Sequence, residues 1–415
     1  MKIVHIYGRI DTMHGATKWL MSFATELNKQ SENLIFCPSF SIERPYWMTT
    51  EVVTSSSAKR TKQRIISVLS NYVNVLRMYR KIPGDADVVV FHAEPSTILL
   101  PFLKHKLPEA QLIYYCYQPP REVYDLWPII KKCYPLWLQL ILQTLFPFYR
   151  CLDRYLVARA HKIIVWGDEY EKYVNKIYRN PSVFHLPASI DFDFFANHDV
   201  ELQAEIASKY EQFDHVLLIN ASLTTKKRVD IFIRLIRDLK DQGINACGVV
   251  IGEGDLKEEL EKQAIEHGVD DRVDLVGFVT QEALPCYYFF ADILCYLEPR
   301  GAWSMSIIEA GAARLPVVVA PGGSMQTLVK DGETGMILPE GYSPEQLLSV
   351  VSGLLANTER AITMGERNYQ HTKQFSLEEA AKQFHTILVS SPRHSHEIPG
   401  HKSDGRGFAR DRIDR

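Results

Sequence analysis

The clearest potential for chemistry lies in the segment that follows an apolar run at residues 291–297. The run predicts a buried parallel strand. Good helix formers begin near Ser304, and Ser306 with Glu309 has the spacing of a capping box, so a helix is expected to start there. Such a helix points free N–H groups and the positive end of its dipole outward from the carboxyl end of the strand. The pattern therefore predicts a binding site for a phosphorylated ligand at this sheet edge.

The residues after this helix add further motifs. A second apolar run, residues 316–320, predicts another strand that ends in a glycine turn. The chain carries Glu309-Ala310, Leu315-Pro316-Val317-Val318, Gly322-Gly323 and Asp331-Gly332-Glu333-Thr334-Gly335. This combination resembles the donor-site signature of the family 4 glycosyltransferases, retaining enzymes with the GT-B fold that use nucleotide-activated sugars. The first glutamate of that signature is absent, and Gly301 occupies its place.

A basic cluster, Lys226-Lys227-Arg228, lies between a predicted strand and a predicted helix. Lys227 falls on the lysine of the family pattern, which implies a point charge that stabilises the pyrophosphate of the donor as the sugar bond breaks. Ser222 replaces the family arginine, so either Lys226 or Arg228 restores the missing charge, or the leaving group is less well stabilised. Without the surrounding motifs, the cluster would be interpreted as a solvated start of a helix.

The resemblance implies further positions around the donor. Gly252 and Gly254 follow a predicted strand, and Phe278 follows another, in turns that would place backbone beside the base and ribose. Glu309 would accept hydrogen bonds from ribose hydroxyls, whereas the residues alone make it a capping-box partner; the two roles are compatible. The donor sugar and phosphate would meet the backbone around Trp303, Ser304, Met305 and Ser306.

The first half of the chain matches the family less closely. Gly15 follows the first strand, where backbone would approach the donor phosphates, and a plain strand-to-helix turn is the alternative. His92 ends another predicted strand and resembles a family histidine that faces the cleft, or it is simply a histidine at a strand end. Tyr117 stands where relatives carry a histidine near the donor sugar, and Arg121 follows on the same acceptor side. With Ser222 and Gly301, Tyr117 is the third departure at a donor-facing position.

Length and composition limit the remaining classes of function. The chain has 415 residues, a formal charge of −3 and a pI near 6.5, so nothing in its overall charge favours nucleic acid. Its seven cysteines are scattered without a C-x-x-C pair, which argues against a disulfide framework and indicates a reducing compartment. The first strand begins directly after Met1, so no secretion signal is expected and a cytoplasmic location follows. No metal-ligand cluster is recognised, and neither a metal nor a cofactor is expected.

The alternation of strands and helices predicts an α/β protein with two doubly wound parallel-sheet domains, as in the GT-B fold. The expected divisions are an acceptor-side domain at 1–195, a crossover linker at 196–214, a donor-binding domain at 215–375, a C-terminal helix at 376–390 that could cross back, and a disordered tail at 391–415. The predicted strands are residues 3–7, 33–37, 87–92, 111–116, 162–166, 182–186, 215–219, 246–251, 272–276, 292–296, 317–320 and 335–338.

An unusual segment lies between residues 131 and 162. Its apolar run, 136–148, is too short to span a bilayer and is flanked by lysine and arginine. That composition suits a helix that lies in the interface of an anionic membrane leaflet. A helix packed within the first domain explains it equally well.

The resemblance to family 4 implies a retaining glycosyltransferase that moves a hexose from a UDP-, GDP- or ADP-sugar to a glycan or lipid-linked glycan acceptor, as in the biosynthesis of polysaccharide, lipopolysaccharide or glycoconjugates. The expected location is the cytoplasm, with contact at the inner face of the cytoplasmic membrane as a further option. Two alternatives remain. One is a catalytically degenerate GT-B protein that binds sugar nucleotide or a partner transferase, and the less favoured one is a sugar-nucleotide 2-epimerase, which needs acidic and basic groups in the cleft.

Overall fold

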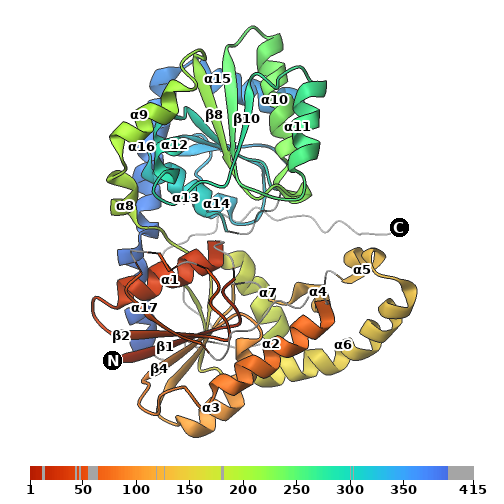
Figure 1. The fold of residues 1–415 in the computed structure, drawn as a ribbon, viewed down its shortest axis with the longest axis vertical. Helices are drawn as coiled ribbons and strands as arrows, with labels where there is room; N and C mark the ends of the chain where they lie inside the picture. Colours follow the sequence, from red (N-terminus) through yellow and green to blue (C-terminus); the bar gives the residue numbers. More distant parts are fainter. Residues whose placement is uncertain are drawn as a thin grey trace, which may run out of the picture.

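The computed structural model describes residues 1–11, 15–42, 44–45, 48–54, 64–117, 119–125, 127–178, 182–299, 301 and 303–390. The predicted tail at 391–415 lies outside these residues. The chain forms two layered α/β domains, one above the other in Figure 1, and the last helix returns to the first domain.

The first domain is built on a seven-stranded parallel sheet of order β3-β2-β1-β4-β5-β6-β7. The strands are β1 (Lys2–Tyr7), β2 (Glu32–Cys37), β3 (Glu51–Thr54), β4 (Val88–His92), β5 (Gln111–Tyr115), β6 (Lys162–Val165) and β7 (Val183–His185). The helices are α1 (Gly15–Leu27), α2 (Arg64–Met78), α3 (Leu100–Lys106), α4 (Arg121–Tyr124), α5 (Trp127–Ile130), α6 (Leu136–Val157) and α7 (Asp168–Tyr178).

The second domain is built on a six-stranded parallel sheet of order β10-β9-β8-β11-β12-β13. The strands are β8 (His215–Asn220), β9 (Ala246–Ile251), β10 (Val273–Gly277), β11 (Ile293–Tyr296), β12 (Val317–Val319) and β13 (Gly335–Ile337). The helices are α8 (Phe192–Ala196), α9 (Val200–Ser208), α10 (Val229–Asp241), α11 (Lys257–Glu266), α12 (Leu284–Phe290), α13 (Met305–Ala312), α14 (Met325–Leu328), α15 (Pro344–Leu355) and α16 (Thr358–Thr372). The last helix, α17 (Leu377–Val389), lies on the first domain.

The second sheet is buried on both faces, as its apolar strands require. Along β8, Val216 and Leu218 contribute to one hydrophobic cluster, while Leu217 and Ile219 contribute to the cluster on the other face. Helix α10 covers the latter face with residues spaced by three and four positions. On β9, a Cβ at Gly248 would lie 2.7 Å from the ring of Phe232, so glycine allows this helix to pack directly on the strand.

The sequence-based prediction of the fold class is confirmed. Every predicted strand has a counterpart whose ends agree within one residue, and β3 is an additional strand. Strand β3 has four residues at the edge of the first sheet, and its side chains are exposed or half-buried, so it lacks the apolar run that marks the others. The segment 196–214 contains helix α9, which packs against α12 of the second domain.

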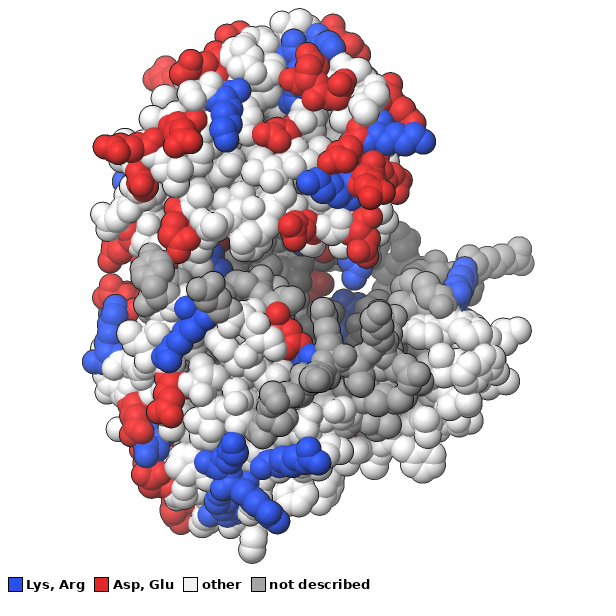
Figure 2. Space-filling model, viewed as in Figure 1, with Lys and Arg blue, Asp and Glu red and all other residues white. Residues whose placement is uncertain are grey.

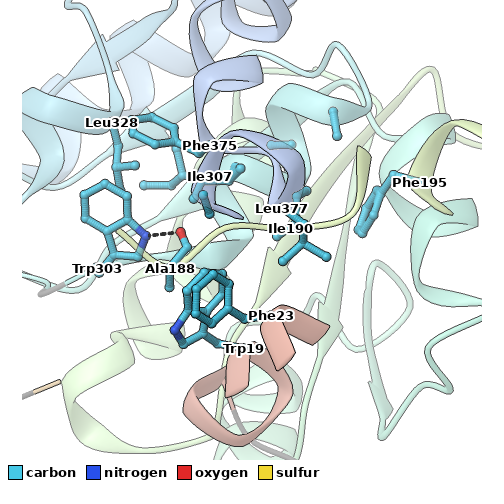
Figure 3. Packing of buried hydrophobic residues seen from close by; sticks show 14 of the residues in the cluster. Trp19, Phe23, Ala188, Ile190, Phe195, Trp303, Ile307, Leu328, Phe375 and Leu377 are labelled. Atoms are coloured by element: carbon cyan, nitrogen blue, oxygen red, sulfur yellow. Dashed lines mark hydrogen bonds between the residues drawn. The ribbon is translucent and has the colours of Figure 1, made fainter. Parts of the chain in front are cut away.

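The two domains share one continuous hydrophobic cluster (Figure 3). Trp303 of the second domain donates its indole N–H to the Ala188 carbonyl at 2.8 Å, beside the ring of Phe375. Helix α17 then packs on α1, where Phe384 meets Phe23. The buried ammonium group of Lys162 donates to the Leu388 carbonyl at 2.9 Å and to that of Ile387, which fixes the end of α17 on the first sheet.

Candidate active site

The candidate site lies where the strand order of the second sheet changes direction. The chain runs outward from β8 through β9 to β10 and then returns to pair β11 with β8 on the other side. Parallel sheets bind ligands at the carboxyl ends of strands at such switch points. The loop that follows β8 carries Lys227, and the loop that follows β11 carries Glu298, Gly301 and Ser304.

Lys227 and Glu298 form an ion pair across this switch point. The ammonium group of Lys227 donates to Glu298 Oε2, which also accepts the Tyr296 hydroxyl at 2.8 Å. The side chains of Lys227 and Glu298 are 26% and 18% exposed, so both can be reached from solvent. The lysine therefore lies at the predicted position with its charge balanced by a carboxylate that the sequence analysis did not single out.

Glu309 does not act as the capping-box partner that its spacing to Ser306 predicted. Ser304 is the N-cap residue of α13, and the Ser306 hydroxyl donates to the Asn220 carbonyl at 2.9 Å instead. Glu309 is 3% exposed and accepts hydrogen bonds from Tyr288 at 2.8 Å and from the Asn220 amide at 3.2 Å. Side-chain partners on β8 and α12 thus replace the helix terminus as the hydrogen-bond donors to this carboxylate.

Lys18 connects the same carboxylate to the first domain. Its ammonium group lies 3.3 Å from Glu309 Oε1, and its side chain is 17% exposed. Lys18 is on the second turn of α1, which begins at Gly15. A Cβ at Gly15 would lie 3.8 Å from Met305 Sδ, so the start of α1 faces the start of α13. The structure therefore brings together Gly15, Lys18, Met305 and Glu309 from opposite domains.

The glycines after β9 serve close packing between loops. A Cβ at Gly252 would overlap the Ala221 carbonyl, and one at Gly254 would overlap the backbone of Leu223. These contacts hold the β9 loop against the β8 loop, and Leu223 N–H donates to the Glu253 carbonyl at 2.9 Å. They keep the backbone of both loops at the sheet edge, as the predicted ligand site requires.

The other residues of the second domain that were predicted to contact the sugar-nucleotide donor differ in their exposure and in their partners. Ser222 is exposed at the end of β8, and Phe278 is 66% exposed after β10. Arg228 adopts the left-handed conformation at φ 53° and pairs with Asp230 at 3.2 Å. Arg228 thus holds its charge beside a carboxylate of its own helix, α10.

In the first domain, His92 and Tyr117 belong to a buried chain of hydrogen bonds. The Tyr117 hydroxyl lies 2.6 Å from His92 Nδ1, His92 Nε2 lies 2.9 Å from His5 Nδ1, and His5 Nε2 lies 3.1 Å from Asn33 Oδ1. Both histidines are fully buried. Burial lowers the pKa of His5 to about 4 and that of His92 well below its usual range. His92 is therefore buried behind Tyr117, whose ring packs on Trp166.

The direction of this chain follows from one amide. The Asn33 side-chain N–H donates to the Ser31 carbonyl at 3.0 Å, so its oxygen faces His5 and accepts. With neutral rings, His5 then accepts from His92, and His92 accepts from the Tyr117 hydroxyl.

Arg121 lies at the start of α4, where it pairs with Asp125 at 2.8 Å and stacks on the ring of Tyr173 at 4.0 Å. A three-residue group at Asp168, Glu171 and His185 offers ligand atoms within 4.8 Å of one another, which the sequence analysis did not recognise as a cluster. His185 pairs with Glu171 at 2.7 Å, and such exposed groups are common without a metal.

The sequence reasoning missed Lys18, Tyr288, Tyr296 and Glu298. Glu298 follows an apolar strand directly and precedes the family loop, which is the one local signal that could have identified it. Lys18 gives no such signal, because its partner Glu309 lies far along the chain and in the other domain.

Residues 204–371 match the family model described as glycosyl transferases group 1. The chain is 29% identical over 189 residues to a GDP-mannose-dependent alpha-(1-6)-phosphatidylinositol monomannoside mannosyltransferase of Mycolicibacterium smegmatis, covering 44% of this chain and 49% of that protein. It is 25% identical over 223 residues to an alpha-D-kanosaminyltransferase of Streptomyces kanamyceticus, covering 53% and 58%. The matches thus span about half the length of these curated relatives.

The solved structures resemble nearly the whole chain. HepE of Anabaena in complex with UDP and glucose has a TM-score of 0.71 at 15% identity, covering 94% of this chain and 99% of that one. WaaG, a glycosyltransferase involved in lipopolysaccharide biosynthesis, has a TM-score of 0.67 at 16% identity, covering 93% and 99%. The chain therefore has the GT-B fold, and residues 204–371 are similar to the glycosyl transferases group 1.

Proposed function

We propose that this chain is a retaining glycosyltransferase similar to family 4, which moves a hexose from a nucleotide-diphosphate sugar to a glycan or lipid-linked glycan acceptor. The observation that carries the proposal is the position of Lys227 at the switch point between β8 and β11, where it pairs with Glu298 of the loop that leads into α13. An ammonium group and a helix N-terminus at one sheet edge suit a diphosphate.

In the proposed reaction, the bond between the anomeric carbon and the diphosphate oxygen breaks, and a bond to the acceptor oxygen forms on the same face. The proton of the acceptor hydroxyl passes to a donor phosphate oxygen, and the nucleoside diphosphate leaves. Lys227 and the dipole of α13 stabilise the negative charge that grows on the leaving group. These groups supply the stabilisation without a metal ion or a cofactor.

The relatives favour a nucleotide-sugar donor. HepE structures hold UDP or UDP-glucose, and the mycobacterial relatives are described as GDP-mannose-dependent. The acceptors of the relatives include a phosphatidylinositol mannoside, which supports a lipid-linked acceptor for this chain.

The proposal is tested by thermal unfolding of the purified chain with UDP, GDP, ADP and their common sugar conjugates. At a hundredfold excess over the dissociation constant, one of them should stabilise the fold by about 2.7 kcal/mol. Lys227→Ala should lose most of this effect, whereas Lys262→Ala, which removes an exposed lysine from α11, should keep it. Equal responses from the two variants would contradict the role of Lys227.

The alternative, a degenerate GT-B protein that binds without transfer, is motivated by three features of the site. Gly301 and Ser222 lack the charged side chains of the family pattern, and Tyr117 replaces a histidine. In that case, a sugar nucleotide would bind without turnover, and the Ser222→Arg variant would show no transferase activity either. Glu298 and the histidines behind Tyr117 weigh against this alternative. They provide polar groups near Gly301 and Tyr117, two of the positions where the chain differs from the family pattern.

We also propose peripheral contact with an anionic membrane through α6. Eight apolar or aromatic residues form a stripe on the exposed side of this helix: Leu136, Trp137, Leu140, Ile141, Leu145, Phe148, Leu152 and Tyr155, each between 47% and 78% exposed. Among the described residues, none of the helices is both long and apolar enough to cross a bilayer. A helix with one apolar face suits the membrane interface instead.

The opposite side of α6 is fixed to the first domain. Tyr149 donates to Glu94, and Asp153 accepts from Tyr124 at 2.7 Å. Burial raises the pKa of Glu94 to about 7. Because these polar groups anchor the inner side, the apolar stripe is held on the outer surface, where the face of α6 at the lower right of Figure 2 is mostly uncharged.

The charge around α6 favours an anionic lipid surface as the occupant of the stripe. Residues 131–161 contain Lys131, Lys132, Arg150, Arg154 and Arg159 but only one acidic residue, the buried Asp153. Arg159 stacks on Tyr155 at 3.3 Å, at one end of the stripe. Each basic residue near an anionic leaflet contributes about 1 kcal/mol. The proposed location is therefore the cytoplasmic face of a membrane.

A further inference from the structure

We propose that Glu298 supplies the carboxylate that binds the donor sugar, in place of the acidic side chain that the chain lacks at Gly301. The inference rests on the proposed function, because it assigns a role within the donor site. It also explains how a site with glycine at that position could still recognise a sugar.

The space that a side chain at position 301 needs is occupied. A Cβ built on Gly301 would lie 2.5 Å from the hydroxyl oxygen of Tyr296 and 2.7 Å from its Cε1 atom. Tyr296 is 6% exposed on the buried strand β11, so its ring has little freedom to move. The Gly301 carbonyl accepts the Ser324 N–H at 3.2 Å, which fixes the loop in this position. Glycine is therefore required here by Tyr296.

The same tyrosine directs another carboxylate to this place. Its hydroxyl donates to Glu298 Oε2 at 2.8 Å, so the group that excludes an acid at Gly301 positions the acid at Glu298. Among the described residues, Lys227 is the other hydrogen-bond donor to Glu298, and it reaches the same oxygen. An ionised carboxylate has about four lone-pair sites. Oε1 is therefore open to further donors in a side chain that is 18% exposed.

The pairing of Glu298 with Lys227 matches the chemistry of the ligand. A sugar hydroxyl donates hydrogen bonds to a carboxylate, and the adjoining diphosphate accepts them from an ammonium group. In a nucleotide sugar, the sugar is bonded directly to the diphosphate. Glu298 and Lys227 likewise lie side by side, so one ligand could contact both. When a diphosphate binds, the Lys227 ammonium group donates hydrogen bonds to the phosphate as well as to Glu298. The Glu298 carboxylate can then accept more hydrogen bonds from the sugar.

This arrangement gives Glu298→Gln opposite effects on two ligands. Loss of the carboxylate removes the strong hydrogen-bond acceptor for the sugar, and it also releases Lys227 from its counter-ion. The nucleoside diphosphate alone should therefore bind as tightly as before or more tightly. The sugar conjugate should lose affinity relative to the diphosphate by about tenfold, as expected for hydrogen bonds to a charged group.

The experiment is calorimetric titration of wild-type protein and variants with a nucleoside diphosphate and its sugar conjugate, comparing the ratio of the two dissociation constants. Tyr296→Phe, which keeps the ring but removes the hydroxyl, should shift the ratio in the same direction by a smaller factor. Glu366→Gln is the matched control, since it removes an exposed carboxylate paired with Arg314 at 2.8 Å. It should leave both constants unchanged.

The outcomes separate the inference from the proposed function. If Glu298→Gln weakens both ligands by the same factor, or leaves the ratio unchanged, Glu298 does not bind the sugar, although the donor site stands. If the wild-type protein binds neither ligand, the proposed function is wrong, and the role proposed for Glu298 is wrong as well. Thermal unfolding of each variant shows whether a change in binding reflects a loss of the fold.

Discussion

Single residues explain both the successes and the errors of the sequence-based site. Lys227 was predicted because a motif surrounds it, and the structure places it at the expected sheet edge. The capping box at Ser306 and Glu309 was wrong, because Tyr288, Asn220 and Lys18 compete for the same carboxylate. Spacing along a chain predicts local partners, whereas these come from other elements. Glu298 was overlooked for the same reason, since its partner Lys227 follows a different strand.

The buried histidines provide a test at this scale. Because burial lowers the pKa of His5 and His92, the unfolded chain binds more protons than the folded one below about pH 6.5. The free energy of unfolding is therefore fully present above that pH and falls as the pH drops toward 4. The expected loss is about 1.4 kcal/mol per pH unit for each histidine in that window.

Urea unfolding at pH 7 and pH 5 measures this effect. A His5→Gln, His92→Gln double variant should lose less stability between the two pH values than the wild-type protein. His105→Gln, at an exposed position on α3, is the control and should behave as wild type. An identical pH dependence in the double variant would show that these rings do not titrate as their burial implies.

At the scale of elements, the strands could be predicted and the surroundings of the helices could not. Buried parallel strands are short apolar runs, so every one except the edge strand β3 was found with nearly correct ends. The apolar run of α6 left two interpretations open, because composition does not say which side of a helix is covered. The structure shows that α6 is anchored on one side and exposes an apolar stripe on the other.

The membrane proposal belongs to this scale. The chain should float with vesicles that contain phosphatidylglycerol, and bind less well to pure phosphatidylcholine or at high salt. Trp137→Glu with Leu140→Glu should reduce binding at least tenfold, because both side chains lie within the stripe. Ile265→Glu with Ile362→Glu alters two equally exposed apolar residues elsewhere and should have no effect.

Two results would contradict membrane contact through α6. One is equal vesicle binding by the two double variants. The other is a wild-type protein that sediments as a dimer, becomes monomeric in the α6 variant and does not bind vesicles, which would assign the stripe to a second copy of the chain.

At the scale of the whole molecule, the two domains are joined at the site itself. Lys18 reaches Glu309 across the boundary, Trp303 donates to Ala188, and α17 crosses back to α1 (Figures 1 and 3). The sequence predicted two domains from the alternation of strands and helices. It could not predict these contacts, because they depend on how the two domains pack against each other.

The most direct test of the central claim is release of nucleoside diphosphate from the sugar nucleotide that binds, with a membrane lipid extract as the source of acceptor. We expect release that depends on the extract and falls at least a hundredfold in Lys227→Ala, since removal of one preorganised charge at a leaving group costs about that much. Lys262→Ala, at an exposed position on α11, should remain active. Tight binding of the sugar nucleotide without release, under every acceptor condition, would contradict a glycosyltransferase and leave a protein that only binds.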